Sequence, residues 1–342
     1  MKAKIGIIGG GSWGTALGIL LANKNHKVKM WVRNQGQLKE MQEKSENVRY
    51  LPEVQLPKEL KLSNNIEEVL SDKDIVLLAT PSHSIRQILK EYGSHIKREQ
   101  IIVNVAKGIE NDTLMRVSQI VQEFLPDNKY VMLSGPSHAE EVARGIPTTV
   151  VSASTDRDAA QYIQDVFMTV DFRVYTNLDV VGVELAGALK NVIALAAGIS
   201  DGSGYGDNTK AALMTRGIFE MARLGEKMGA SPSTFSGLAG IGDLIVTCTS
   251  MLSRNRQAGI LIGKGASVEE SIREIGMVVE GIKTTKSTYM LAKKYDVDMP
   301  ITEELYKVLY EGKDVKQSVP NLMDRDKKEE MENMVFFKGI NW

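Results

Sequence analysis

A run of glycines directly after an apolar segment is the feature that most constrains this 342-residue chain. Residues 4–8 have the composition of a short buried strand, and Gly9-Gly10-Gly11-Ser12-Trp13-Gly14 follows them in the pattern G-x-G-x-x-G. In this pattern Gly9 permits a tight turn, Gly11 lets a pyrophosphate approach the backbone, and Gly14 lets the next helix pack closely on the sheet. The alternative is a tight strand-to-helix connection without a ligand. No G-K-[ST] follows, which argues against a nucleotide triphosphatase.

The first half of the chain alternates short β-branched runs with amphipathic segments. This alternation is typical of a parallel sheet that carries helices on both faces. The spacing predicts strands over 4–8, 28–32, 60–62, 75–80, 101–105, 130–133, 148–152 and 172–175, and crossover helices around 16–22, 85–92, 114–124 and 159–167.

The strand signal disappears after about Asn177, and consecutive helices follow. The predicted fold class is therefore α/β: a doubly wound Rossmann domain over residues 1–176, then an all-helical substrate-binding domain over 177–342. A glycine-rich segment, 198–206, is expected to be a mobile loop, and the charged run 327–330 to be a solvated face. The predicted helices of this half are 178–198, 208–228, 253–262, 268–275, 283–294 and 302–311.

Charge and composition exclude several classes of protein. The formal net charge of -1 gives no general attraction to nucleic acid, so an anionic ligand needs a local cluster of donors. A single cysteine excludes an internal disulfide framework, and four scattered histidines do not suggest a metal site. The amino terminus begins directly on the first strand, and the most apolar segment, 180–199, contains Glu184, Lys190 and Asn191. We therefore expect a cytoplasmic protein with no membrane span, no metal and no nucleic-acid partner; a homodimer remains open.

Arg33 stands at the end of the second predicted strand, where an acidic residue would bind the ribose 2′-hydroxyl of NAD. A guanidinium at that place can pair with a 2′-phosphate, which favours NADPH over NADH. The alternative is that Arg33 is only a surface charge.

Lys107 and Ser137 follow the ends of two further predicted strands, where ligands bind in open parallel sheets. Lys107 would hold an anion or polarise a carbonyl, and Gly135 and Ser137 would bring backbone and hydroxyl groups to the ligand. Both segments are equally well explained as ordinary turns.

Lys190 lies in the middle of an almost entirely apolar helix. Burial would lower the pKa of its amine from about 10.4 and make it a usable general base. The competing interpretation is a lysine whose stem is buried while its ammonium reaches solvent.

The segment 237–259 contains a second group of polar residues. Asp243 is suited to hydrogen bonds with a polyol, and Ser253, Arg254 and Asn255 precede a helix whose N-terminus suits a phosphate. Asp243 is equally compatible with a helix cap, and Arg254 with a surface ion pair. Cys248 in this segment is interpreted as an inert small hydrophobic residue.

Eight motifs in order give the chain a close resemblance to the bacterial-type NAD(P)-dependent glycerol-3-phosphate dehydrogenase family. They are GGGSWGTA, NVRYLPEVQLP, AKGIE, LSGPSHAEEVARGIPT, VELAGALKNVIALAAGISDG, GDNTKAALMTRG, GLAGIGDLIVTCTSMLSRNRQAG and VVEGIKTT. The resemblance implies a Rossmann domain followed by a helical substrate domain, interconversion of dihydroxyacetone phosphate and sn-glycerol 3-phosphate with NADPH or NADH, and a supply of glycerol 3-phosphate to phospholipid synthesis. One departure is Asn34 after Arg33, where many relatives have a second basic residue or a histidine.

The resemblance also implies a role for individual residues. Lys190 corresponds to the catalytic base. The substrate-binding set is Lys107, Gly135, Ser137, Lys190, Asp243, Ser253, Arg254 and Asn255. The cofactor-binding set is Gly9, Gly11, Ser12, Trp13, Gly14, Arg33, Lys107, Ala139, Arg254, Val278 and Glu280.

Two other functions fit part of the sequence. Another two-domain reductase, of the 2-hydroxyacid or ketopantoate type, would share both halves but would not need the phosphate cluster 253–255. A non-catalytic NADPH sensor would need neither Lys190 nor Asp243.

Overall fold

The computed structural model describes residues 2–327, which form two compact units. The first unit comprises Met1–Lys107 and Met115–Val180, and the second comprises Gly108–Leu114 and Val181–Trp342. Lys327 is exposed, and the other residues of the charged run, 328–330, lie outside the described part of the chain.

The first unit is built on an eight-stranded sheet with the order β10-β9-β8-β7-β6-β1-β2-β5. All neighbouring strands are parallel except β8 and β9, which are antiparallel. The predicted parallel sheet is therefore confirmed in all its pairs but this one. The short α6 between β8 and β9 does not return the chain to the opposite edge, as a parallel connection would require. The strands are β1 (Lys4–Ile8), β2 (Lys27–Trp31), β5 (Leu60–Ser63), β6 (Ile75–Leu78), β7 (Ile101–Asn104), β8 (Tyr130–Ser134), β9 (Thr148–Ala153) and β10 (Phe172–Asn177).

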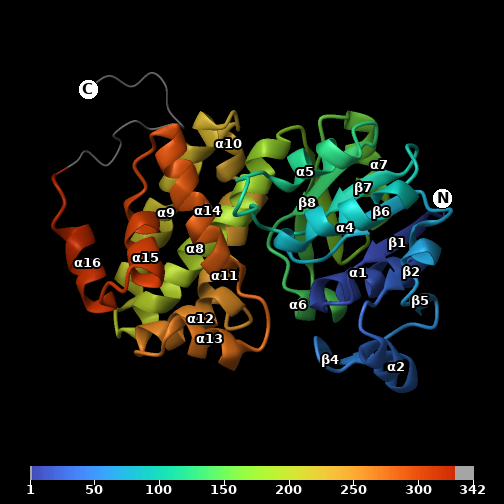
Figure 1. Ribbon diagram of the computed structural model, residues 1–342, viewed down its shortest axis with the longest axis horizontal. Coiled ribbons are helices and arrows are strands. Elements are labelled where there is room, and N and C mark those ends of the chain that lie inside the picture. The colour runs from blue at the N-terminus through green and yellow to red at the C-terminus, as the bar shows by residue number, and fades with distance from the viewer. Residues whose placement is uncertain (1, 328–342) are drawn as a thin grey trace. The chain divides into compact units, whose positions relative to one another are not determined.

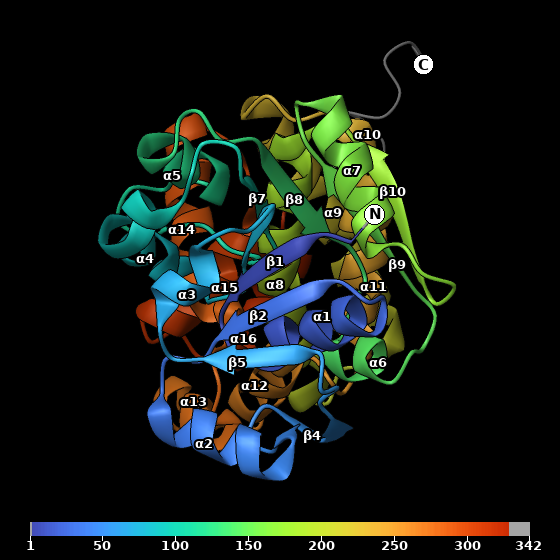
Figure 2. The same ribbon diagram turned by 90° about the vertical axis from the view of Figure 1, so that its right-hand side faces the viewer.

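Alternate residues of the central strands enter two separate hydrophobic cores. Ile5 and Ile7 of β1 belong to one core and Ile8 to the other. The first core includes apolar residues of α1 (Ser12–Asn23), α6 (Ala139–Ala143) and α7 (Arg157–Phe167), and the second includes those of α3 (Ile66–Leu70), α4 (Ile85–Tyr92) and α5 (Val117–Phe124). The two groups of helices cover opposite faces of the sheet (Figure 2). A strand buried on both faces is continuously apolar, as these sequences are.

Sequence reasoning missed the segment between β2 and β5. It forms α2 (Gln35–Lys44) and a small antiparallel pair, β3 (Glu46–Asn47) and β4 (Leu51–Gln55). Only Leu38 and Met41 of α2 are buried, so this helix has no long apolar stripe for a periodicity test to find.

The second unit consists of helices in the part that the structure describes (Figure 1). Its helices are α8 (Val180–Gly202), α9 (Asp207–Lys227), α10 (Pro232–Phe235), the π-helical turn η3 (Leu238–Gly242), α11 (Asp243–Thr249), α12 (Arg254–Gly263), α13 (Val268–Ile275), α14 (Glu280–Tyr295), α15 (Pro300–Tyr310) and α16 (Val315–Met323). The prediction of a mobile loop over 198–206 was wrong for residues 198–202, which continue α8.

Four glycines explain why α8 continues through this segment. A Cβ added to Gly198 would lie 2.2 Å from the carbonyl oxygen of Arg256 on α12, and one added to Gly202 would lie 2.2 Å from that of Ile260. In the other direction, a Cβ on Gly259 would meet the carbonyl of Leu195 at 2.3 Å, and one on Gly263 that of Ile199 at 2.3 Å. The glycines therefore allow two helix backbones to touch rather than forming a flexible hinge.

α8 is also long and apolar enough to be tested as a membrane span. Of its most apolar 18-residue window, 89% is buried inside the protein. Burial of this extent is what a core helix requires.

Glu220 of α9 provides a pH-dependent contribution to stability. Its carboxylate accepts hydrogen bonds from the Ile301 and Thr302 N–H groups at 2.7 and 3.2 Å, at the start of α15. Burial raises the pKa of Glu220 from 4.5 to about 7, although these N–H groups and Arg223 act in the opposite direction. The folded protein thus keeps the proton to a higher pH than the unfolded chain does.

We expect the contribution of Glu220 to the free energy of unfolding to fall as the pH rises from 4.5 to 7, by at most about 3 kcal/mol. Glu220→Gln removes the titration while keeping an acceptor oxygen. Urea unfolding of both proteins between pH 5 and 8 tests this: the stability of wild type relative to the variant should be greatest at the acid end. Parallel curves would show that Glu220 does not titrate in this range.

Candidate active site

The glycine turn joins β1 to α1 in the first unit. Gly9 has a φ of +128°, and a Cβ there would lie 2.6 Å from the carbonyl oxygen of Ala79. A Cβ on Gly14 would lie 2.1 Å from the carbonyl oxygen of Gly9, whereas one on Gly11 would meet no atom within 4 Å. The backbone is therefore crowded on its inner side and open at Gly11.

The first turn of α1 has donors that no side chain caps. Gly11 is the N-cap residue and makes no side-chain cap, and Ser12 is the first helical residue. The indole Nε1 of Trp13 is buried without a hydrogen-bond partner. Free N–H groups at a helix N-terminus attract anions, and an unpartnered buried donor needs an acceptor. These residues fit a dinucleotide cofactor.

Arg33 and Asn34 follow β2, and both are exposed. The Oδ1 atom of Asn34 accepts a hydrogen bond from the N–H of Gln37 at 2.8 Å and so caps α2. No acidic residue occurs between residues 32 and 37. The end of β2 therefore offers a cation and no carboxylate to a ribose.

Lys107, Gly135 and Ser137 come together in the first unit, although 27 residues separate Lys107 from Gly135 along the chain. The ammonium of Lys107 donates to the carbonyl oxygen of Gly135 at 2.9 Å and to Oγ of Ser137 at 3.3 Å. The Ser137 hydroxyl donates in turn to the Gly135 carbonyl at 2.8 Å. Two strand ends, those of β7 and β8, thus supply one polar cluster, and Ala139 begins α6 just beyond it.

In the second unit, Lys190 of α8 and Asp243 of α11 form a buried ion pair. Nζ lies 2.5 Å from Oδ1 of Asp243, and the two side chains are 7% and 1% exposed. Nζ also donates to Oγ1 of Thr247 at 2.7 Å, and that hydroxyl donates to the main-chain carbonyl of Asp243 at 2.6 Å. Burial of Lys190 favours its neutral amine, whereas the neighbouring carboxylate of Asp243 favours the ammonium. The two effects therefore act in opposite directions on the proton that Lys190 carries.

This geometry excludes the two competing structural interpretations, an ammonium that reaches solvent for Lys190 and a helix cap for Asp243. The ammonium of Lys190 is held by a carboxylate inside the unit, and Asp243 is the first residue of α11 rather than its cap. Sequence reasoning missed Thr247. The signal was available, since Asp243 and Thr247 are four residues apart and share one face of a helix.

The N-terminal turn of α12 holds the three residues predicted to bind phosphate. Oγ of Ser253 accepts from the N–H of Arg256 at 3.3 Å and caps the helix. The Asn255 amide donates to Oδ1 of Asn191 at 2.9 Å and accepts from the N–H of Gly281 at 2.8 Å, so it ties α12 to α8 and α14.

A surface ion pair was the alternative role predicted for Arg254. In the structure the ion pair at this turn is made by Arg256 instead. Its Nη2 lies 2.7 Å from Oδ2 of Asp201, whose other oxygen lies 2.9 Å from Nζ of Lys210. Arg254 is half-buried at the start of the helix. Val278 and Glu280 lie in the same unit, where Glu280 begins α14.

Cys248 on α11 is buried, and burial raises the pKa of its thiol to about 12. This confirms the interpretation of Cys248 as an inert hydrophobic residue. No group of three or more His, Cys, Asp or Glu residues able to hold a metal ion occurs within residues 2–327.

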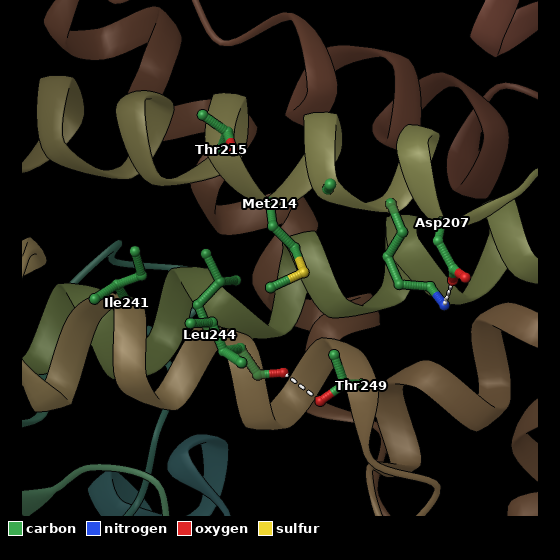
Figure 3. A pocket seen from close by; sticks show the side chains of 9 residues that line it. Asp207, Met214, Thr215, Ile241, Leu244 and Thr249 are labelled. Carbon is green, nitrogen blue, oxygen red and sulfur yellow. Dashed lines mark hydrogen bonds and ion pairs between the residues drawn. The ribbon is translucent and has the colours of Figure 1, made fainter.

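A hollow of about 370 Å³ lies between the first half of α9 and α11. Met214, Ile241 and Leu244 line it together with Asp207 and Thr249 (Figure 3). Lys190 and Asp243 are not among its lining residues. We therefore place the candidate chemistry at the buried ion pair and not in this apolar hollow.

A glycine turn at the carboxyl edge of a doubly wound sheet, with a helical unit that carries a buried lysine–aspartate pair, is the arrangement of a nicotinamide-dependent dehydrogenase. Comparison with known proteins agrees. The family models described as NAD-dependent glycerol-3-phosphate dehydrogenase N-terminus and C-terminus match residues 4–160 and 179–320. The chain belongs to this family.

Individual relatives match over nearly the whole chain. This chain is 56% identical over 326 residues to a glycerol-3-phosphate dehydrogenase [NAD(P)+] of Clostridium tetani, and the match covers 95% of this chain and 93% of the relative. It is 54% identical to the enzyme of that name from Thermoanaerobacter sp., covering 96% and 99%. The crystal structure of glycerol-3-phosphate dehydrogenase from Coxiella burnetii superposes with a TM-score of 0.92 at 37% identity, covering 95% of this chain and 99% of that one.

Proposed function

We propose that this protein interconverts dihydroxyacetone phosphate and sn-glycerol 3-phosphate with NADPH or NADH, and so supplies glycerol 3-phosphate for phospholipid synthesis in the cytoplasm. In this proposal residues 1–176 are the dinucleotide-binding domain and residues 177–342 the substrate-binding domain; the two compact units differ from these bounds in that Gly108–Leu114 joins the second unit and the first extends to Val180. The observation that carries the proposal is the buried contact of Lys190 with Asp243 and Thr247, in a chain that matches both halves of the family.

The glycine turn holds the cofactor. Open backbone at Gly11 and the uncapped N–H groups from Ser12 onward bind the pyrophosphate, and Trp13 supplies a further donor. Ala139, Val278 and Glu280 complete the set on the strength of the family resemblance. When bound, the nicotinamide supplies the hydride for reduction or accepts it in the reverse direction.

Lys190 donates a proton to, or accepts it from, the oxygen on carbon 2 of the substrate. In reduction its ammonium donates to the carbonyl oxygen as negative charge develops there, and in oxidation the neutral amine takes the proton of the hydroxyl. Asp243 and Thr247 hold Nζ in one place, because their oxygens lie 2.5 and 2.7 Å from it. Fixing the position of the proton donor in advance removes an ordering cost from the reaction.

The remaining residues bind the phosphate and the other oxygens of the substrate. The cation of Arg254 and the N-terminus of α12 suit a dianionic phosphate. The amide of Asn255 already donates once and accepts once, which leaves its second N–H for the ligand. Lys107, Gly135 and Ser137, which form one polar cluster, belong to the substrate-binding set on the strength of the family resemblance.

The decisive experiment measures the loss of NADPH absorbance when dihydroxyacetone phosphate is added to the purified protein. NADH and the non-phosphorylated ketone dihydroxyacetone serve as controls. Oxidation that requires the phosphate supports the proposal. If neither cofactor is oxidised although NADPH binds, the protein is a sensor or a reductase for another substrate.

Arg33→Ser tests the choice of cofactor. If Arg33 pairs with the 2′-phosphate, the KM for NADPH should rise about tenfold or more, because a charge-assisted hydrogen bond contributes about 1.5–3 kcal/mol. The KM for NADH, which has no 2′-phosphate, should change by less than about twofold. The ratio of the two kcat/KM values is the quantity to compare. An unchanged ratio would identify Arg33 as a surface charge.

A further inference from the structure

The carbonyl oxygen of Gly10, in the middle of the glycine turn, accepts hydrogen bonds from two side chains. Nε2 of Gln37 donates to it at 2.7 Å and Nδ2 of Asn47 at 3.0 Å. Asn47 is only 1% exposed and also donates to Oγ1 of Thr15 in α1 at 2.8 Å. Both lone pairs of this carbonyl are thus occupied by side chains of the first unit.

The two donors come from the segment between β2 and β5. Gln37 lies in the first turn of α2, which Asn34 caps, and Asn47 lies on β3, which pairs with β4. Nε2 of Gln37 also lies 3.4 Å from Oδ1 of Asn47, so the two amides contact each other. The segment also places Leu38, Met41, Leu51 and Val54 in the first hydrophobic core. Burial of these apolar residues does not explain why two amide side chains meet at the carbonyl of Gly10.

Planarity of the peptide bond supplies that explanation. In a trans peptide the N–H and the C=O point in opposite directions, so fixing the carbonyl of Gly10 also fixes the N–H of Gly11. That N–H points away from Gln37 and Asn47, at the residue where an added Cβ would meet no atom within 4 Å. Consecutive glycines are the most freely rotating peptides in a chain, and an unrestrained turn would pay a large entropy cost on binding a ligand.

We propose that Gln37 and Asn47 are positioning residues for the cofactor: they hold the Gly10–Gly11 peptide with its N–H directed at the dinucleotide pyrophosphate. Neither residue contacts the substrate, and neither takes part in the proton transfer. This inference rests on the proposed cofactor site at the glycine turn and extends it to residues outside the G-x-G-x-x-G pattern.

Asn47→Ala tests the proposal. We expect the Kd for NADPH, measured by calorimetric titration without substrate, to rise about tenfold, as loss of a buried hydrogen bond at a binding loop implies. The KM for dihydroxyacetone phosphate at saturating NADPH should change by less than about twofold, as should kcat. General destabilisation would not be expected to raise the Kd for NADPH while leaving the KM for dihydroxyacetone phosphate and kcat unchanged.

Asn128→Ala is the matched control. Nδ2 of Asn128 also donates to backbone carbonyls of the first unit, those of Lys97 at 2.7 Å and Gln100 at 2.8 Å, and it supports a different loop. We expect this variant to lower the thermal unfolding temperature without changing the Kd for NADPH. A Kd raised equally in both variants would show that Asn47 is only structural and would overturn the proposal.

Gln37→Met provides a second variant with a milder structural change. Because either donor alone still restrains the carbonyl, each single substitution should weaken NADPH binding less than the pair does. The fold-change in Kd caused by the double substitution should therefore exceed the product of the fold-changes caused by the two single substitutions. Wild-type affinity in Gln37→Met/Asn47→Ala would overturn the proposal. A wild-type protein that bound no NADPH would instead refute the cofactor site itself.

Discussion

Lys190→Met should lower kcat by about three orders of magnitude, within the range of 10² to 10⁴ that positioned acid–base groups contribute. The methionine keeps the length and apolar character of the lysine stem but has no proton to transfer. The Kd for NADPH should remain within about twofold of wild type, since Lys190 is not among the residues assigned to the cofactor and the glycine turn belongs to the other unit. Steady-state kinetics and a calorimetric titration measure the two quantities.

A structural side effect must be separated from this catalytic effect. Removing Lys190 leaves the Asp243 carboxylate buried without its cation, a change that typically costs about 3–5 kcal/mol. Lys190→Met/Asp243→Leu removes both charges and should recover much of that stability while activity stays absent. If kcat returned together with stability, the ion pair would be structural and the proton donor would be another group.

Lys307→Met is the control for replacement of a partnered lysine. Lys307 on α15 pairs with Glu303 at 3.0 Å and with Glu304 at 3.5 Å, in the same unit as Lys190. Because surface ion pairs contribute about 0–1 kcal/mol, both stability and kcat should be nearly unchanged. A large loss of kcat in this variant would weaken the assignment of Lys190.

Gly198→Ala should destabilise the helical unit. Its Cβ would lie 2.2 Å from the carbonyl oxygen and 2.9 Å from the carbonyl carbon of Arg256, so the backbones of α8 and α12 must separate. Alanine is the better helix former by about 1 kcal/mol. Overpacking against a rigid backbone costs about 1–3 kcal/mol or more, so the expected net result is a loss of stability.

The same displacement should affect the substrate more than the cofactor. Arg256 lies in the first turn of α12, next to Asn255, and moving this turn moves the predicted phosphate site. We expect kcat/KM for dihydroxyacetone phosphate to fall about tenfold or more, because a misplacement of about 1 Å can cost two orders of magnitude in rate. The Kd for NADPH should change less, since Arg254 is the only cofactor-binding residue assigned to this turn and the glycine turn lies in the other unit. Urea unfolding and substrate kinetics together test this.

Gly93→Ala is the appropriate comparison for Gly198→Ala. Gly93 has a helical φ of −58°, and its added Cβ would meet its nearest neighbour, Leu125, only at 3.9 Å. Alanine should fit there and stabilise the protein by up to about 1 kcal/mol through the unfolded state. Equal losses in the two variants would mean that the α8–α12 contact is less rigid than its distances indicate.

Local pattern was enough to predict the elements that have a strong period or a strong turn. The glycine turn, the strand 4–8, and the helices 85–92 and 268–275 have the bounds that the sequence predicts. Their signals are local, because apolar spacing and glycine chemistry act within one or two turns of chain. The polar segment containing α2, β3 and β4 has no such signal, and it was missed.

The sequence by itself determined the class of fold, the family and the types of residue available for chemistry. Only the tertiary structure decided which residues meet: Lys190 with Asp243 and Thr247, Lys107 with Ser137, and Asn47 with Gly10. It also decided that β9 runs antiparallel to β8 and that residues 198–202 are helical. The physical reason is the same in each case: these contacts join residues far apart in the chain, and their partners are chosen by the packing of whole elements, which no local pattern records.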